Sequence, residues 1–115
     1  MIWREKFEVE YGPLYDNFGM GTTIWSPLGM GILTGKYNDG SIPEGSRFFE
    51  NENKLLQGYF DGLFSGEKRE KTLSMLQGLG TLAGELDCTQ AQLALAWAIK
   101  NTDVSTAIFG ASRVE

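Results

Sequence analysis

Glycines and a lysine that follow a short apolar run form the part of this sequence best able to do chemistry. The β-branched and aromatic residues 22–25 are followed by Ser26-Pro27, and three glycines between positions 29 and 35 then precede Lys36. Glycines allow backbone N–H groups to approach a ligand closely, and the lysine adds positive charge. The segment therefore predicts a binding site for an anion, and the alternative is a structural turn without a ligand.

The spacing of these glycines excludes two common nucleotide-binding loops. The dinucleotide fingerprint G-x-G-x-x-G needs a glycine where Thr34 stands. A Walker A loop needs its first glycine at Met30, and Tyr37 replaces the Ser or Thr that holds magnesium. Any phosphate site here must have another architecture.

The absence of histidine limits the chemistry further. With 0 His, the chain cannot form a Ser-His-Asp triad, a Cys-His pair or the commonest zinc ligand set. Its 1 cysteine, Cys88, cannot form an internal disulfide, which is compatible with a reducing compartment. Cys88 is interpreted as buried filler rather than a reactive thiol. Any chemistry must therefore use carboxylates, tyrosine, lysine or a bound cofactor, and we name no metal ligand and no catalytic residue from these residues.

Composition predicts one small globular domain. The chain has 115 residues, of which 42% are hydrophobic and 22% charged, and a net charge of −5. A nucleic-acid partner would require a basic face, and membrane insertion would require a run of ~18 apolar residues, which is absent. Residues 1–10 lack the apolar region of a signal peptide, so a cytoplasmic location is expected.

Hydrophobic periodicity predicts helices over residues 4–18, 52–61, 67–86 and 89–100, with strands at 22–25 and 104–109. The first helix should be interrupted at Gly12-Pro13 and end at Gly19. Ser65 or Gly66 should cap the third, and a capping box from Thr89 to Gln92 should open the fourth. Residues 26–47 are expected to form a long loop.

Three expectations concern burial. The strand at 22–25 lacks polar alternation and is expected to be buried. The helix at 89–100 is apolar nearly all round, so other elements should cover it and Trp97 should lie in the core. The aromatic residues of 48–64 are interpreted as a packing patch rather than a binding cage.

The order of elements predicts an α/β fold with a parallel sheet. Two strands joined by a helical crossover run parallel, but two strands alone do not make a stable parallel sheet. We therefore expect the carboxyl-side portion of a larger α/β barrel or sheet, incomplete as it stands. Three glycines in the helix expected over residues 67–86 (Gly78, Gly80 and Gly84) are poor helix formers, and nothing local in the sequence explains them.

A second group of small residues followed by a cation, Gly110-Ala111-Ser112-Arg113, comes after the second strand. In (β/α)₈ barrels the phosphate site lies at the loops after the last two strands, which this pair of strand ends would fit. Trp25 is either core or a flat platform for a stacked ring. Arg47 is either solvated or a clamp for a phosphate.

The string W-S-P-L-x-x-G-x-L-T-G-K-Y at 25–37, followed by I-P-x-G-S-R at 42–47, resembles the aldo-keto reductases. It is most similar to the branch that contains the voltage-gated potassium-channel β subunits. Residues 86–97 and 104–112 match the same family in the same order, so the resemblance covers essentially the whole chain.

The resemblance implies a (β/α)₈ TIM barrel that uses NADP(H) to reduce aldehydes and ketones, with residues 1–115 as part of that oxidoreductase domain. Trp25 would stack on the nicotinamide, and the loop up to Arg47 would fold over the cofactor. Its pyrophosphate would be lined by Ser26, Pro27, Leu28, Gly31 and Lys36. Its 2′-phosphate would contact Gly110, Ser112 and Arg113.

The resemblance also implies that the proton donor, a tyrosine with its helpers, lies on segments that this sequence does not contain. The chain alone is therefore expected to be inactive and poorly folded. The partner of the whole protein would be a small carbonyl substrate. The alternative is a channel-regulatory β subunit, which binds NADP(H) and a channel as an oligomer; a third reading is an interaction module that has lost the cofactor.

Overall fold

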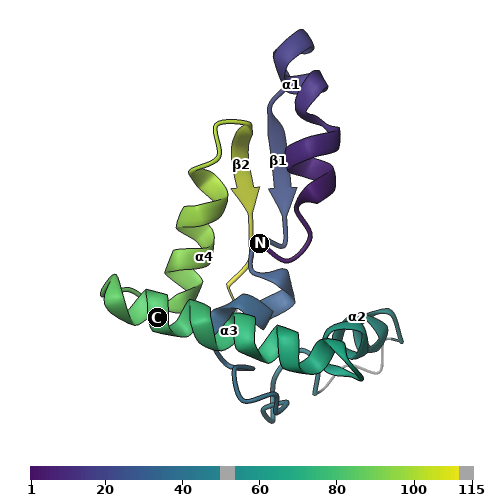
Figure 1. Cartoon of the computed structure of the whole chain (residues 1–115), viewed down its shortest axis with the longest axis vertical. Helices are drawn as coiled ribbons and strands as arrows, with labels where there is room; N and C mark the ends of the chain where they lie inside the picture. Colours follow the sequence, from purple (N-terminus) through teal and green to yellow (C-terminus); the bar gives the residue numbers. More distant parts are fainter. Residues whose placement is uncertain (50–53, 112–115) are drawn as a thin grey trace.

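Two parallel strands with helices around them make up the fold of this chain, in a computed structural model that describes residues 1–49 and 54–111 (Figure 1). Strand β1 is Thr22–Trp25 and strand β2 is Val104–Ile108. They pair in parallel, with Thr22 opposite Val104 and Trp25 opposite Ile108. The predicted parallel pairing is confirmed.

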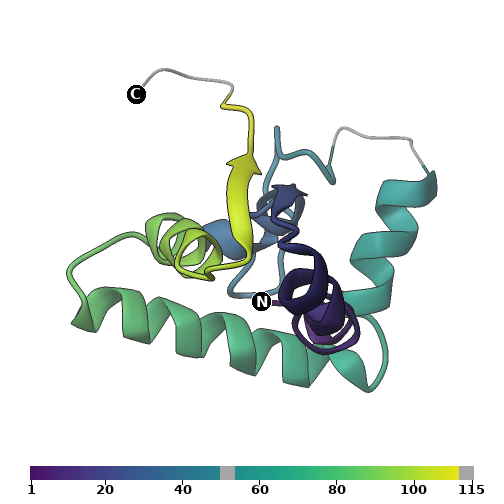
Figure 2. The same ribbon diagram turned by 90° about the horizontal axis from the view of Figure 1, so that it is seen from above.

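The helical elements surround the strands on several sides. Figures 1 and 2 show α4 beside β2, α1 on the side of β1, and α3 running across the end of the molecule where the strands finish. In chain order the helical elements are the π-helical turn η1 (Lys6–Glu10), α1 (Gly12–Phe18), the 3₁₀ segment η2 (Gly29–Thr34), α2 (Lys54–Phe64), α3 (Lys68–Glu85) and α4 (Gln90–Ile99). None of them, within the described ranges, is long and apolar enough to cross a membrane.

The first predicted helix is divided into two segments. A π-helical turn ends at Glu10, and α1 begins at Gly12 with Pro13 in its first turn, where a missing N–H costs nothing. Gly19 ends α1 in the left-handed region with φ 60°, and its N–H donates to the carbonyl of Tyr15 at 3.0 Å. The predicted break and the predicted stop are both confirmed.

Strand β1 is less buried than predicted. Thr22 and Ile24 are half-buried, whereas Thr23 and Trp25 are exposed, so the described residues cover one face of the strand. The expectation of a buried strand was wrong, because burial on both faces requires further elements that the described residues do not supply.

The helix boundaries follow the predictions with three differences. Helix α2 extends to Phe64, and the expected loop 26–47 contains η2. Helix α3 has Glu67 at its N-cap without a side-chain hydrogen bond, so neither Ser65 nor Gly66 caps it. Gly66 instead has φ 58° two residues after the last residue of α2, a left-handed conformation that is common just beyond the end of a helix.

The capping box of α4 is confirmed. Gln92 donates its backbone N–H to Thr89 Oγ1 at 3.1 Å, and the N–H of Thr89 donates to Gln92 Oε1 at 2.8 Å. The expectation that α4 is covered all round was wrong, since Trp97 is 36% and Ile99 61% exposed. The helix packs against β2, η2 and α3, and these contacts leave Trp97 and Ile99 partly open to solvent.

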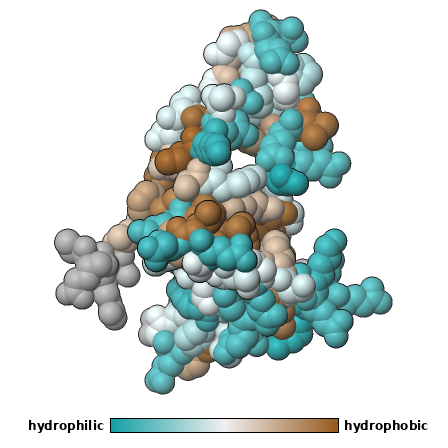
Figure 3. Space-filling view, turned by 60° about the vertical axis from the view of Figure 1, so that its left-hand side comes forward, coloured by the Kyte–Doolittle hydropathy of each residue, from teal (hydrophilic) through white to brown (hydrophobic). Residues whose placement is uncertain are grey.

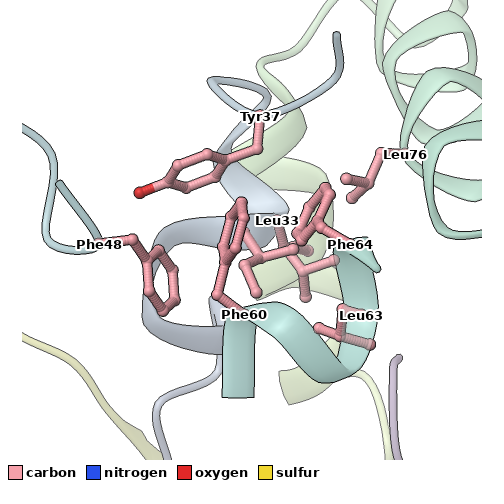
Figure 4. Close-up of a cluster of buried hydrophobic side chains, with 9 residues drawn as sticks. Leu33, Tyr37, Phe48, Phe60, Leu63, Phe64 and Leu76 are labelled. Atoms are coloured by element: carbon pink, nitrogen blue, oxygen red, sulfur yellow. The ribbon is translucent and has the colours of Figure 1, made fainter. Parts of the chain in front are cut away.

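The core is an aromatic cluster at the end of the molecule where the strands finish. Figure 4 shows the ring of Tyr37 facing Phe48, Phe60 and Phe64, and Leu76 of α3 closes the cluster. The rings of Phe60 and Phe64 stack with centroids 4.2 Å apart, and Tyr37 and Leu76 are both 0% exposed. The interpretation of residues 48–64 as a packing patch is confirmed for these three phenylalanines.

Candidate functional site

The carboxyl ends of the two strands bring two of the predicted site segments to one edge of the sheet. Trp25 pairs with Ile108, so Ser26 on one strand and Phe109-Gly110 on the other follow at the same edge. The side chain of Trp25 is 75% exposed, which rules out the core alternative for this residue in the described structure. Ser112 and Arg113 lie outside the described residues.

The turn after β1 contains a series of left-handed residues. Ser26, Met30 and Gly31 have φ angles of 50°, 58° and 101°, although side chains disfavour this region. The N–H of Gly29 donates to Ser26 O at 2.8 Å, and the N–H of Gly31 donates to Leu28 O at 3.1 Å. Because these two N–H groups bond within the turn, an anion here would be held by side chains rather than by them.

Gly31 makes room for Lys36. A Cβ atom at position 31 would lie 3.1 Å from both Cε and Nζ of Lys36, which therefore folds back over the turn. The ammonium group also lies 5.2 Å from the centroid of the buried Tyr37 ring. Two of the predicted site residues thus lie side by side, and the missing side chain of Gly31 leaves space for the end of the Lys36 side chain.

The charge of Lys36 is unpaired in the described structure. Across residues 1–49 and 54–111 the ion pair that forms joins Arg4 to Glu8 at 3.3 Å. The neighbouring carboxylate, Asp39, accepts instead from the N–H of Ser41 at 2.9 Å and from its hydroxyl at 2.8 Å. These hydrogen bonds hold the pKa of Asp39 below its usual value, because they stabilise the charged form.

Arg47 projects from a pair of tight turns. The N–H of Ser46 donates to Pro43 O at 3.1 Å, and that of Phe49 donates to Ser46 O at 3.0 Å. The next residue, Phe48, is 6% exposed in the aromatic core, whereas Arg47 itself is exposed. The core therefore anchors the backbone that carries the exposed guanidinium of Arg47.

An apolar cavity of about 340 Å³ lies beside the same edge. Trp25, Ser26 and Pro27 contribute to its wall, together with Trp3 from the N-terminal segment and Trp97 from α4. Figure 3 shows hydrophobic side chains at the surface across the middle of the molecule, between more hydrophilic ends. Lys36 does not line this cavity, so the hydrophobic wall and the cation are separate parts of the site.

A partly buried amide pair lies next to the turn that carries Lys36, and no sequence pattern identified it. Asn38 Nδ2 donates to Gln90 Oε1 at 2.9 Å, and Gln90 is 6% exposed. These residues are 52 positions apart and belong to no motif. The one available signal was Gly80 in α3, whose presence in a helix had no local explanation. Among the described residues no group of three or more His, Cys, Asp and Glu side chains could hold a metal ion.

This combination of parallel strands, helical crossover and glycine turn with a lysine has a clear counterpart in known proteins. The aldo/keto reductase family matches residues 2–115 of the chain. The chain belongs to this family of TIM-barrel proteins, and its two-stranded open sheet corresponds to part of such a barrel.

Three relatives are similar to this chain over nearly its whole length. A "Probable voltage-gated potassium channel subunit beta" of Arabidopsis thaliana is 46% identical over 113 residues, covering 98% of the chain and 32% of the relative. A "Putative voltage-gated potassium channel subunit beta" of Schizosaccharomyces pombe is 44% identical over 114 residues, covering 99% of the chain and 31% of the relative. A "Probable voltage-gated potassium channel subunit beta" of Oryza sativa subsp. japonica is 44% identical over 110 residues, covering 96% of the chain and 31% of the relative. The chain thus spans about a third of the length of these relatives.

Proposed function

We propose that the intact protein is a cytoplasmic NADPH-dependent aldo-keto reductase that reduces aldehydes or ketones. Residues 1–115 form part of its oxidoreductase domain and carry part of the cofactor site. The observation that supports this most is the cation of Lys36, which lies on the glycine turn without a carboxylate partner in the described residues. Such a group fits the binding of a phosphate.

The residues at the sheet edge fit the parts of NADP(H). The exposed indole of Trp25 offers a flat apolar face to the nicotinamide ring. Lys36 and Arg47 are exposed cations suited to the pyrophosphate, and Gly110 begins the segment proposed for the 2′-phosphate. The remaining proposed contacts with the cofactor are Ser26, Pro27, Leu28, Gly31, Ser112 and Arg113.

In the proposed reaction the bound cofactor supplies a hydride to the carbonyl carbon. The residues of this chain would bind the cofactor and orient its nicotinamide ring. Trp25 fixes the plane of the ring, and the cations offset the phosphate charge in a protein whose net charge is −5. No tyrosine here is assigned as the proton donor. Tyr37 is 0% exposed in the core, and burial raises the pKa of Tyr59 to about 12.

The first test replaces Lys36 by methionine in the intact protein and measures NADPH affinity by fluorescence titration. A charge-assisted contact contributes roughly 1.5–3 kcal/mol, so K36M should weaken binding by about tenfold or more. Arg47→Ala should weaken it in the same direction. Lys71→Met is the matched control, because Lys71 is an exposed lysine of α3 outside the proposed site. The K71M variant should bind NADPH with the affinity of the wild type.

Unchanged affinity in both K36M and R47A would overturn the cofactor-site assignment. An equal loss in K71M would show that overall charge, rather than the turn, governs binding. Neither result depends on catalytic turnover, so the site is tested separately from the activity.

A channel-regulatory role is the second candidate, and the descriptions of the three relatives favour it. A regulatory subunit of this kind would bind NADP(H), assemble as a homo-oligomer and bind a channel. Multiple turnovers on an aldehyde would support the reductase, whereas stable co-purification with a channel cytoplasmic domain and negligible turnover would support the subunit. If the protein neither turned over an aldehyde nor bound a channel domain, the third reading, an interaction module that has lost the cofactor, would be favoured.

A further inference from the structure

The loop that carries Lys36 is anchored by side chains from α3 and α4. Lys36 occupies the second position of a turn closed by the N–H of Asn38, which donates to Gly35 O at 3.3 Å. Asn38 is bound twice from outside this turn. Its carbonyl accepts from Gln77 Nε2 at 3.2 Å, and its side chain donates to Gln90 Oε1 at 2.9 Å. The end of the turn is thus fixed to two helices.

Two glycines make room for this arrangement. A Cβ at Gly80 of α3 would lie 3.1 Å from Asn38 Nδ2 and 3.3 Å from Gln90 Oε1. A Cβ at Gly35 would lie 3.4 Å from the same Gln90 oxygen, and Gly35 has φ 95°. Both positions bring backbone against the amide pair, which accounts for a glycine inside α3 that costs helix propensity.

The rest of the loop is held in a similar way. The guanidinium of Arg69 lies over Gly40, where a Cβ would be 2.7 Å from its Nη2 atom. The N–H of Gly40 donates to Tyr37 O at 2.9 Å, and Tyr37 is itself fixed in the aromatic core. Lys36 therefore stands on a backbone that is immobilised on both sides, with its own side chain directed back over Gly31.

The amide pair is costly to bury. Asn38 Oδ1 and Gln90 Nε2 are buried and have no hydrogen-bond partner among the described residues. Each unpaired group loses its hydration, so an apolar pair would serve core packing better. We interpret the polar pair at this position as a means of fixing one defined geometry.

We propose that Gln90, acting through Asn38, is a positioning residue that holds Lys36 for the phosphates of the dinucleotide. This inference rests on the proposed function, since it assumes that Lys36 binds the cofactor. The hydrogen bond of Gln90 goes to Asn38, two residues after Lys36. Its effect on binding must therefore pass through the turn.

A double-mutant cycle on the intact protein tests this, with Gln90→Met, Lys36→Met and the double variant titrated with NADPH. Q90M should weaken binding by about three- to tenfold, within the range of a weakened charge-assisted contact. The double variant should bind no more weakly than K36M alone, because Gln90 has nothing left to position. Adenosine 2′-monophosphate, a probe without the pyrophosphate, should bind Q90M as it binds the wild type.

Gln92→Met is the matched control, since it replaces the same residue type in the same first turn of α4. It breaks the capping box but leaves the Asn38 contact intact. Q92M should lower the melting temperature without changing the NADPH affinity. If Q90M fails to fold, Gln77→Met removes the other bond to Asn38 from the exposed side of α3 and takes its place in the cycle.

The outcomes separate the two proposals. If K36M leaves NADPH affinity unchanged, the proposed function is wrong at this site, and the positioning role falls with it. If K36M weakens binding but the effects of K36M and Q90M multiply, only the positioning role is overturned. Equal weakening of the monophosphate probe in Q90M would likewise reduce Gln90 to a structural residue.

Discussion

The side chain of Lys36 shows how a single residue in this chain receives its position from both near and distant neighbours. Gly31, five residues earlier, leaves the space over which it folds, and the ring of Tyr37 lies 5.2 Å from its ammonium group. Gln77 and Gln90 fix the turn from helices far along the chain. The residue is exposed, yet the turn that carries it is held by hydrogen bonds from two helices.

Tyr59 provides a prediction at the residue scale, because burial raises its pKa from 10.0 to about 12. The folded protein holds this proton more tightly than the unfolded chain. The resulting stability is fully present below pH 10 and is lost as the pH rises through about 12. Tyr59→Phe should therefore reduce the loss of stability between neutral and strongly alkaline pH. Urea unfolding of both proteins across that range measures it.

The size of this effect is limited by the partial exposure of Tyr59, which packs its ring against Trp3 at 4.6 Å with an edge-to-face geometry. An identical alkaline decline in wild type and Y59F would show that the phenol is not responsible. The other three tyrosines are present in both proteins, so their contributions cancel in the comparison.

Helix α3 shows at the scale of an element why composition alone misjudges a sequence. Its glycines are unfavourable for a helix, and they have different surroundings. A Cβ at Gly78 or Gly84 would meet nothing within 4 Å, whereas at Gly80 it would meet the amide pair. Gly80 thus has a packing reason in this structure, and nothing in the described residues explains Gly78 and Gly84.

This difference predicts opposite behaviour for two alanine substitutions in one helix. Gly78→Ala should raise the free energy of unfolding by about 0.5–1 kcal/mol, because alanine loses less backbone entropy. Gly80→Ala should fail to give this gain, since its methyl group displaces amides that hold each other at 2.9 Å. Chemical denaturation of both variants measures the difference, and an equal stabilisation at both positions would contradict it.

At the scale of the whole molecule, the described structure has a firm core at one end and uncovered apolar surface elsewhere. The core joins η2, α2, α3 and α4 around the aromatic rings. By contrast Trp25 is 75%, Phe18 73% and Ile108 58% exposed. An open two-stranded sheet leaves these side chains without cover from the described residues, in keeping with a chain that spans about a third of its relatives.

The core should dominate stability at this scale. Leu76 is 0% exposed and lies where α3 meets the aromatic cluster. Leu76→Ala should lower the free energy of unfolding by about 2–5 kcal/mol, the usual cost of removing a buried leucine side chain. Leu55→Ala on the exposed side of α2, where the side chain is 83% exposed, serves as the comparison and should change stability far less. Equal effects of the two substitutions, measured by urea unfolding, would contradict this account of the core.

The sequence alone determined the elements, because their signals are local. The capping box at Thr89, the break at Gly12-Pro13 and the stop at Gly19 each act within a few residues, and all three were predicted. The parallel pairing followed from the helical crossover between the strands. The glycines and Lys36 marked a candidate site through residue types that fit an anion.

Only the tertiary structure decided burial and the contacts between distant segments. It exposed β1 and Trp97, which composition had placed in the interior, because burial depends on which other elements are near. It placed the side chain of Lys36 over Gly31. It also joined Asn38 to Gln90 across 52 residues, a contact that no local pattern encodes since it arises from the packing of three segments around Gly80.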